Sequence, residues 1–183
     1  MVVMESQVVL KAGDSAPEFD LVGTDDKKYS LSSFKDYEAL LVIFMCNHCP
    51  YVKAKVDAIN EIQNKFKGRV AVVGINSNDS IAYPDDSFDN MKKFANEKRI
   101  SFFYLVDDTQ KTAKKYGAVC TPDPFLFNKE QRLVFHGRID NAMKPEDRAT
   151  EKTMISNIEK LLGGQKIVKD FDPSIGCSIK WKN

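Results

Sequence analysis

Two cysteines stand three positions apart in the segment FMCNHCPYV, at Cys46 and Cys49. Thiols at this spacing can exchange with a disulfide, because a thiolate attacks one sulfur and a second thiol then releases the product. The same pair could instead hold a metal ion with further ligands, or be small buried side chains without chemistry. Besides two more cysteines, the chain has His48 and His136 to complete such a metal site. The pattern favours a redox pair over both alternatives.

The residue after the pair, Pro50, indicates where the next helix begins. Proline suits the first position of a helix, so Cys49 would cap the helix N-terminus. The partial positive charge of that terminus stabilises an anion, and we therefore expect the pKa of the Cys49 thiol to be lowered. His48 lies inside the motif, where its cation could stabilise the thiolate and favour the reduced protein. The alternative is a solvated loop histidine that contacts nothing.

Apolar runs and amphipathic segments alternate around this motif. The run ALLVIF, residues 39–44, lacks polar alternation and predicts a strand that is buried on both faces. From Pro50 the period becomes that of a single helix, which Gly68 ends. The apolar face of that helix comprises Val52, Val56, Ile59, Ile62 and Phe66. The motif is therefore predicted at the carboxyl end of a buried strand, where sites form in open α/β sheets.

The remaining elements continue the alternation. We expect strands over residues 69–75 and 100–106, a helix around residues 88–95, a short helix that Asp108 or Thr109 caps and Gly117 ends, a hairpin within residues 124–139, and a last helix over residues 154–162. Extended chain and a hairpin that turns at residues 23–27 precede them. The order predicts one α/β domain over residues 1–183, with residues 165–183 as a tail packed on it.

Composition and charge narrow the classes of partner. The chain has 43% hydrophobic and 29% charged residues, and its net charge is +1 from 27 basic and 26 acidic side chains. No long basic block suggests a nucleic acid or a membrane surface as partner. We expect a cytoplasmic protein, because the sequence begins without a leader-like segment and has no apolar run of roughly 20 residues. Four cysteines are too few for a disulfide scaffold.

Three further segments carry a family resemblance: AGDSAPEFDLVGTDDKKYSLSSF near the start, YGAVCTPDPFLF before the hairpin, and PSIGCSIKWK in the tail. With the cysteine motif, the sequence resembles the thioredoxin superfamily, and within it the redoxin (AhpC/TSA) branch and its peroxiredoxin-like thiol-disulfide isomerase/thioredoxin homologues. The resemblance implies a thioredoxin-like fold, in which helices flank a central mixed sheet behind an N-terminal hairpin. It also implies a cofactor-free thiol-disulfide oxidoreductase, an antioxidant type of enzyme that acts on disulfides and thiols of proteins or small molecules.

The resemblance assigns roles within the site. It implies that Pro122, preceded by Thr121, is a cis-proline that faces the active-site cysteines. In thioredoxin-type members the phenylalanine of the central strand precedes the attacking cysteine by five positions. Counted from Phe44, that position is Cys49, which leaves Cys46 as the resolving thiol. A register with a gap would instead make Cys46 the attacker, as in oxidoreductases with a histidine in the same motif position.

Two other activities are compatible with parts of the pattern. A peroxiredoxin-like peroxidase is the weaker interpretation, because Val42 and Cys46 stand where that family has a proline and a threonine ahead of its attacking cysteine. A copper-binding protein similar to Sco-type chaperones would need Cys46, Cys49 and the distant His136. Cys120 should lie near the active-site loop, as a third redox thiol or a buried spectator. Cys177 lies in the tail, and the sequence gives it no place relative to the site.

Overall fold

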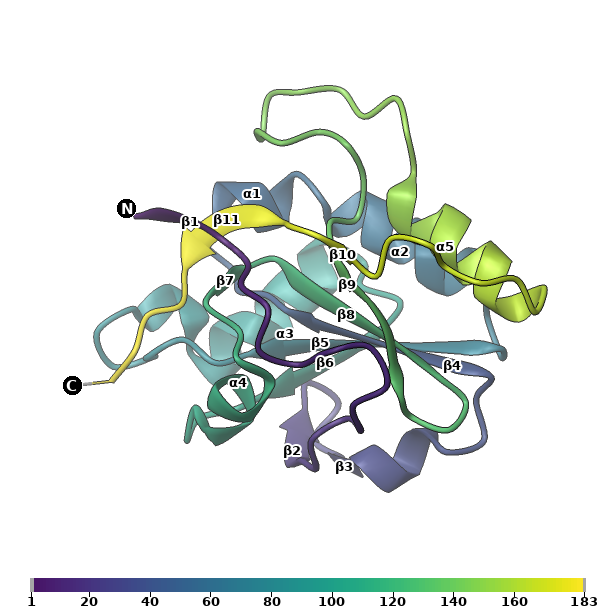
Figure 1. Cartoon of the computed structure of the whole chain (residues 1–183). Coiled ribbons are helices and arrows are strands. Elements are labelled where there is room, and N and C mark those ends of the chain that lie inside the picture. Colours follow the sequence, from purple (N-terminus) through teal and green to yellow (C-terminus); the bar gives the residue numbers. More distant parts are fainter. Residues whose placement is uncertain (1, 183) are drawn as a thin grey trace.

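The computed structural model describes residues 2–182, and its centre is a mixed eight-stranded sheet (Figure 1). In spatial order the strands are β10 (Phe171–Asp172), β9 (Leu133–Gly137), β8 (Asp123–Asn128), β4 (Ala39–Phe44), β5 (Val70–Asn76), β6 (Phe103–Val106), β2 (Asp20–Gly23) and β3 (Lys28–Ser30). Strands β4, β5 and β6 are parallel, whereas β8 is antiparallel to β4 and β2 is antiparallel to β6. The expected mixed sheet and N-terminal hairpin are therefore confirmed.

Helices cover both faces of this sheet. They are α1 (Pro50–Lys53), α2 (Val56–Lys65), α3 (Phe88–Glu97), α4 (Lys111–Tyr116), α5 (Thr153–Leu162) and the 3-10 helices η1 (Leu31–Phe34) and η2 (Pro84–Asp86). Every residue of β4 and β5 is buried, as expected for strands without polar alternation. On one face Leu41 and Ile43 pack into a core with α2, α3 and α5. On the other face Leu40 and Val42 pack with α4 and η1.

The segment predicted as a single helix from Pro50 to Gly68 contains two helices instead. The chain turns between α1 and α2, where the Lys55 N–H donates to the carbonyl of Val52, only three residues back. The Lys55 ammonium pairs there with the buried carboxylate of Asp140 and also donates to the Ala142 carbonyl. Lys55 is not among the apolar residues that predicted the single helix. Their periodicity therefore could not reveal the break between α1 and α2.

The expected cap of α4 is also wrong. Neither Asp108 nor Thr109 is the N-cap residue, because Gln110 occupies that position with a φ of 60°. The carboxylate of Asp107 reaches forward and accepts the N–H of Ala113 at 3.0 Å. Gly117 ends the helix in the left-handed conformation, as expected.

The tail forms a second, small sheet next to the cysteine motif. Strand β11 (Ile175–Ser178) lies between β1 (Val3–Glu5) and β7 (Cys120–Thr121), antiparallel to both. Figure 1 shows β1 and the yellow β11 side by side next to α1. No helix in residues 2–182 has the length and apolar character that a bilayer crossing requires.

We expect Gly176→Ala to destabilise the protein, because β11 approaches β7 too closely for a side chain at this position. A Cβ atom at residue 176 would lie 2.0 Å from the carbonyl oxygen of Thr121, which belongs to the backbone and cannot rotate away. The free energy of unfolding, measured in urea, should fall by about 1–3 kcal/mol. Gly163→Ala is the control, since its nearest contact would be 3.2 Å, and it should lose less. An unchanged urea midpoint for Gly176→Ala would contradict this packing.

Candidate active site

The two cysteines of the motif lie where β4 ends and α1 begins. Cys49 is the N-cap residue of α1 and Pro50 is the first helical residue, as the sequence predicts. Both thiols are buried, with Cys46 1% and Cys49 0% exposed. An incoming disulfide can therefore reach either sulfur only after local movement of the chain that covers them.

The segment around Thr121 closes one side of this site. The Thr121–Pro122 peptide bond is cis. The Thr121 hydroxyl lies 3.4 Å from the Cys46 sulfur, and the Thr121 carbonyl accepts from the Cys49 thiol at 3.3 Å. One residue thus contacts both cysteines of the motif.

A third thiol completes the site, and it comes from the tail. Strand β11 pairs Cys177 with Thr121, and the Thr121 hydroxyl donates to the Cys177 carbonyl at 3.4 Å. The Cys177 thiol hydrogen-bonds to Cys49, so Cys49 stands between Cys177 and Cys46. Sequence reasoning left Cys177 without a position, since no periodicity marks the tail. Gly176 permits the close approach of β11 to Thr121. This glycine indicates the position of Cys177 only once the pairing of β11 with β7 is known.

These contacts shift the pKa values of the three thiols in opposite directions, downward for Cys49 and upward for Cys46 and Cys177. Hydrogen bonds from the thiols of Cys177 and Cys46 hold the pKa of Cys49 far below the usual cysteine value, against the opposing effect of burial. The backbone N–H of Val52, in the first turn of α1, adds to this effect. The pKa of Cys46 is raised by its bond to Cys49, by burial and by the charge of Asp86. The pKa of Cys177 is raised by its bond to Cys49 and by burial. These shifts favour ionisation of Cys49 over ionisation of Cys46 or Cys177.

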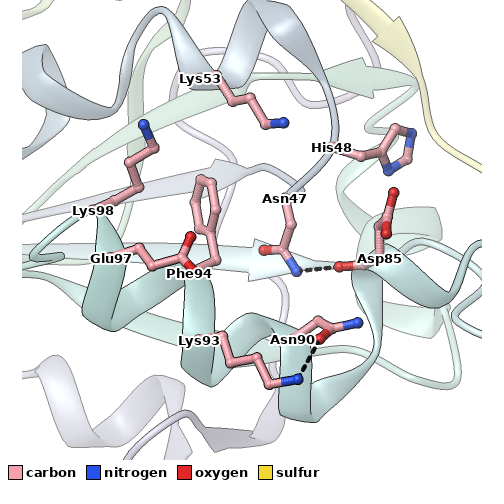
Figure 2. Close-up of a pocket in the computed structure, with 9 residues that line it drawn as sticks. All are labelled: Asn47, His48, Lys53, Asp85, Asn90, Lys93, Phe94, Glu97 and Lys98. Atoms are coloured by element: carbon pink, nitrogen blue, oxygen red, sulfur yellow. Dashed lines mark hydrogen bonds between the residues drawn. The ribbon is translucent and has the colours of Figure 1, made fainter.

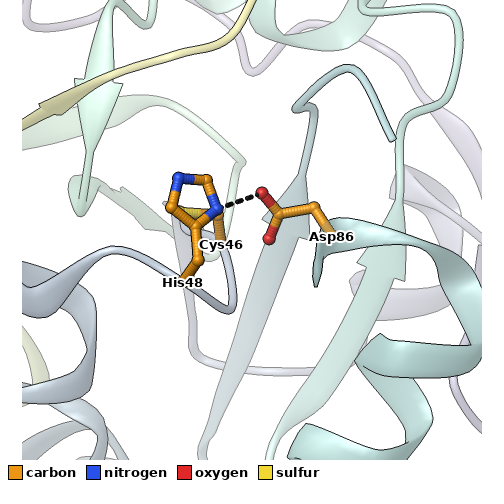
Figure 3. Close-up of side chains that lie close together, drawn as sticks. All are labelled: Cys46, His48 and Asp86. Atoms are coloured by element: carbon orange, nitrogen blue, oxygen red, sulfur yellow. Dashed lines mark hydrogen bonds and ion pairs between the residues drawn. The ribbon is translucent and has the colours of Figure 1, made fainter. Parts of the chain in front are cut away.

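His48 is held by a buried carboxylate and does not point freely into solvent. Its Nδ1 lies 2.6 Å from Oδ2 of Asp86, whose side chain is fully buried (Figure 3). Asp86 also accepts from the Asn47 N–H at 2.7 Å and from the Asn78 amide at 2.8 Å. The His48 ring stacks on Tyr83 at an interplanar angle of 8°. The alternative of a histidine that contacts nothing is therefore wrong, and Asp86 is a site residue that sequence reasoning missed.

The pair with Asp86 favours the charged form of His48, which lies next to the cysteine motif. The hydrogen bond to Asp86 raises the pKa of His48 against the opposing effect of burial, and the negative charge of the Cys49 thiolate raises it further. We expect His48→Gln to remove this cation and raise the pKa of Cys49, measured as the pH dependence of its alkylation. The midpoint potential of the cysteine site should become more negative, because the reduced state loses a stabilising charge. An unchanged pKa and potential would contradict a role for His48 in this electrostatic environment.

A surface pocket of about 450 Å³ opens beside the motif (Figure 2). Asn47 and His48 line its inner side, and α1 and the region of α3 supply Lys53, Lys93 and Lys98. Among the described residues, its lining includes none of the three thiols. The pocket therefore adjoins the cysteine site without containing it.

His136 does not join the cysteines. It lies on β9, where its Nε2 is 2.7 Å from the buried carboxylate of Asp123 and its ring stacks on Phe125. Within residues 2–182, the group of potential ligand atoms within 4.8 Å of one another comes from Cys46, His48 and Asp86 (Figure 3). The set Cys46, Cys49 and His136 of the copper hypothesis is thus not assembled.

Cys120 is close to the site but faces another way. Its sulfur contacts the Ser174 hydroxyl at 3.9 Å and the Pro122 carbonyl at 4.0 Å. Burial raises the pKa of this thiol, and the charge of Asp123 adds to the effect. A buried, protonated thiol is a poor nucleophile.

Comparisons with known proteins show the family of this chain. A family model described as Redoxin matches residues 11–154. The thiol-disulfide oxidoreductase ResA of Bacillus thuringiensis is 22% identical over 126 residues, which are 68% of each chain. A chloroplastic peroxiredoxin Q of Oryza sativa is 27% identical over 106 residues, 57% of this chain and 45% of that protein.

Two solved structures resemble almost the whole chain. An uncharacterized conserved protein from Geobacillus kaustophilus has a TM-score of 0.94 at 38% identity and covers 100% of this chain and 97% of its own. A hypothetical protein from Sinorhizobium meliloti has a TM-score of 0.92 at 36% identity and covers 97% and 98%. A putative protein disulfide isomerase from Bacteroides thetaiotaomicron, at 18% identity and a TM-score of 0.68, covers 85% of this chain and 92% of its own and shares the thioredoxin-like fold.

Proposed function

Because the chain belongs to the redoxin family, we propose that it is a thiol-disulfide oxidoreductase in which Cys49 attacks and Cys46 resolves. Redoxins of the thiol-disulfide oxidoreductase and peroxiredoxin types are oxidoreductases. The observation that carries the finer assignment is the position of Cys49 as the N-cap residue of α1, where the helix terminus stabilises a thiolate. The pKa of Cys49 is accordingly lowered and that of Cys46 raised. Two thiols in contact with opposite pKa shifts can act in sequence, as nucleophile and then as resolving group.

The reaction proceeds in two exchanges. The Cys49 thiolate attacks one sulfur of a substrate disulfide, and the other substrate sulfur leaves as a thiolate. Cys46 then attacks the Cys49 sulfur of the mixed disulfide, loses its proton and releases the second substrate thiol. The protein ends with a Cys46–Cys49 disulfide, and the substrate has gained two electrons and two protons. A reducing thiol regenerates the pair by the reverse sequence.

Peroxide reduction is the second candidate, favoured by the likeness to a peroxiredoxin Q. The residues around Cys49 support it less well. Cys46 stands where a peroxiredoxin has a threonine hydroxyl that contacts the peroxide. The hydroxyl of Thr121 lies 3.4 Å from Cys46 and also donates to the Cys177 carbonyl. The Thr121 hydroxyl therefore already has two partners within the protein and is poorly placed to replace the missing threonine as a peroxide contact.

A side-by-side measurement tests the proposal. The reduced protein is mixed with glutathione disulfide or with hydrogen peroxide at equal concentration, and the loss of free protein thiols is followed in time. We expect the disulfide to oxidise the protein faster, with the loss of two thiols per chain. Faster oxidation by peroxide that disappears in Cys49→Ser would favour the peroxidase instead. Oxidation by neither reagent would contradict both activities.

A further inference from the structure

We propose that Cys177 is a second resolving thiol, so that Cys49 can form a disulfide with the C-terminal strand as well as with Cys46. This inference rests on the proposed function, because it requires Cys49 to form a mixed disulfide first. It assigns a chemical role to β11, which the exchange between Cys46 and Cys49 does not need.

The position of Cys177 fits this role better than that of any other thiol outside the motif. The Cys49 sulfur makes hydrogen bonds to both Cys177 and Cys46. The backbone N–H of Cys177 also faces the Cys49 sulfur, and that of Tyr51 faces the Cys177 sulfur. A disulfide requires these two sulfurs, already in hydrogen-bond contact, to approach to about 2 Å.

Strand β11 is also fixed against the site from both sides. On one side, it pairs with β7 at Thr121, the residue that contacts Cys46 and Cys49. On the other side, it pairs with β1. Beyond the strand, the Lys180 carbonyl accepts from the Asp79 N–H and from the Gln110 side chain. These bonds hold Cys177, which is 1% exposed, next to Cys49 in the reduced protein.

The chemistry balances without another reactant. Cys49, joined to a substrate sulfur, is attacked by the Cys177 sulfur, which gives up its proton as it becomes a thiolate. The substrate sulfur leaves and takes up a proton, and a Cys49–Cys177 disulfide remains. Starting from a Cys46–Cys49 disulfide, the same attack releases Cys46 as a thiol and moves the disulfide to β11. By either route the substrate disulfide gains the same two electrons and two protons from the protein thiols.

The test removes Cys46 and asks whether a mixed disulfide at Cys49 persists. Reduced Cys46→Ser protein receives one equivalent of glutathione disulfide, and the products are followed by intact mass and by peptide mapping. We expect the glutathione adduct to disappear as the peptides containing Cys49 and Cys177 become cross-linked. In Cys46→Ser/Cys177→Ser the adduct on Cys49 should persist, whereas the matched control Cys46→Ser/Cys120→Ser should lose it as Cys46→Ser does.

The outcomes separate this inference from the function on which it rests. Equal persistence of the adduct in Cys46→Ser and in Cys46→Ser/Cys177→Ser, with no cross-linked peptide, would overturn the role of Cys177 and leave the proposed function intact. The absence of any adduct on Cys49 in Cys46→Ser/Cys177→Ser would overturn the proposed function and this inference together. Cys177→Ala replaces Cys177→Ser if the buried hydroxyl prevents folding. Oxidised wild-type protein should also contain the Cys49–Cys177 peptide pair, and its absence there would count against the proposal.

Discussion

Replacing Cys49 by serine is expected to abolish the reduction of glutathione disulfide by the reduced protein. The other two thiols of the site, Cys46 and Cys177, lose their bond to Cys49 in this variant, but burial still raises the pKa of each, so neither readily replaces the lost thiolate. A serine hydroxyl ionises far less readily than a thiol and cannot form a disulfide. The rate should fall by a factor on the order of 10⁴ or more, as when other enzymes lose their nucleophile. Stopped-flow measurement of thiol loss provides the check.

The matched control for this change is Cys120→Ser. Cys120 is also a buried cysteine with a raised pKa, but its sulfur contacts Ser174 and not Cys49. This variant should keep the wild-type rate within a few-fold. A Cys49→Ser variant that still reduces the disulfide at close to the wild-type rate would show that another thiol attacks first.

Asp86→Asn should cause the largest loss of stability among single changes at the site. The Asp86 carboxylate is fully buried and accepts hydrogen bonds from His48, Asn47 and Asn78. An asparagine would turn one acceptor into a donor and leave buried donors without partners. We expect the free energy of unfolding to fall by about 3 kcal/mol, within the range for breaking a buried charged pair. Denaturation in urea measures the change.

The pH dependence of this loss has a defined window. The pKa of Asp86 is lowered below 3.8, so its contribution is present above that value and is lost as the pH falls through the folded-state pKa. The pKa of His48 is raised above 6.5, so its contribution is complete below that value and is lost as the pH rises through the folded-state pKa. The difference between wild type and Asp86→Asn should therefore be greatest between pH 3.8 and pH 6.5.

The control for this prediction is the exposed neighbour Asp85. Its backbone carbonyl accepts from the Asn47 amide at 2.8 Å, and this bond survives Asp85→Asn. The Asp85 variant should differ from wild type by well under 1 kcal/mol at every pH. Equal losses in the two variants would show that the buried network around Asp86 does not stabilise the fold.

The sequence could predict those parts of the fold and site that depend on neighbouring residues. The run at residues 39–44 has no polar alternation and forms the buried β4, and Pro50 after Cys49 marks the start of α1. Similar local signs predicted the hairpin of β8 and β9 and the end of α4 at Gly117. The family resemblance added the thioredoxin-like fold.

The parts that sequence reasoning missed depend on contacts between distant segments. Asp86 looks like a solvated acidic residue in a polar loop, and only the fold places it beneath His48. Cys177 lies in a tail without periodicity, and pairing between β11 and β7 brings it to Cys49. At the break between α1 and α2, Lys55 pairs with the distant Asp140. Each of these requires a partner that lies far away in the sequence.

The most direct test of the central claim is the order in which the four thiols of the reduced wild-type protein react. The protein is labelled with iodoacetamide at a series of mildly acidic pH values, and peptide mapping quantifies each cysteine. All four thiols are buried, so differences in their labelling report mainly which one is ionised when the site opens. We predict that Cys49 is labelled first and at the lowest pH, with Cys46, Cys120 and Cys177 unlabelled until the pH is much higher. Labelling of Cys46 before Cys49 would contradict the account, because it would make Cys46 the attacking thiol.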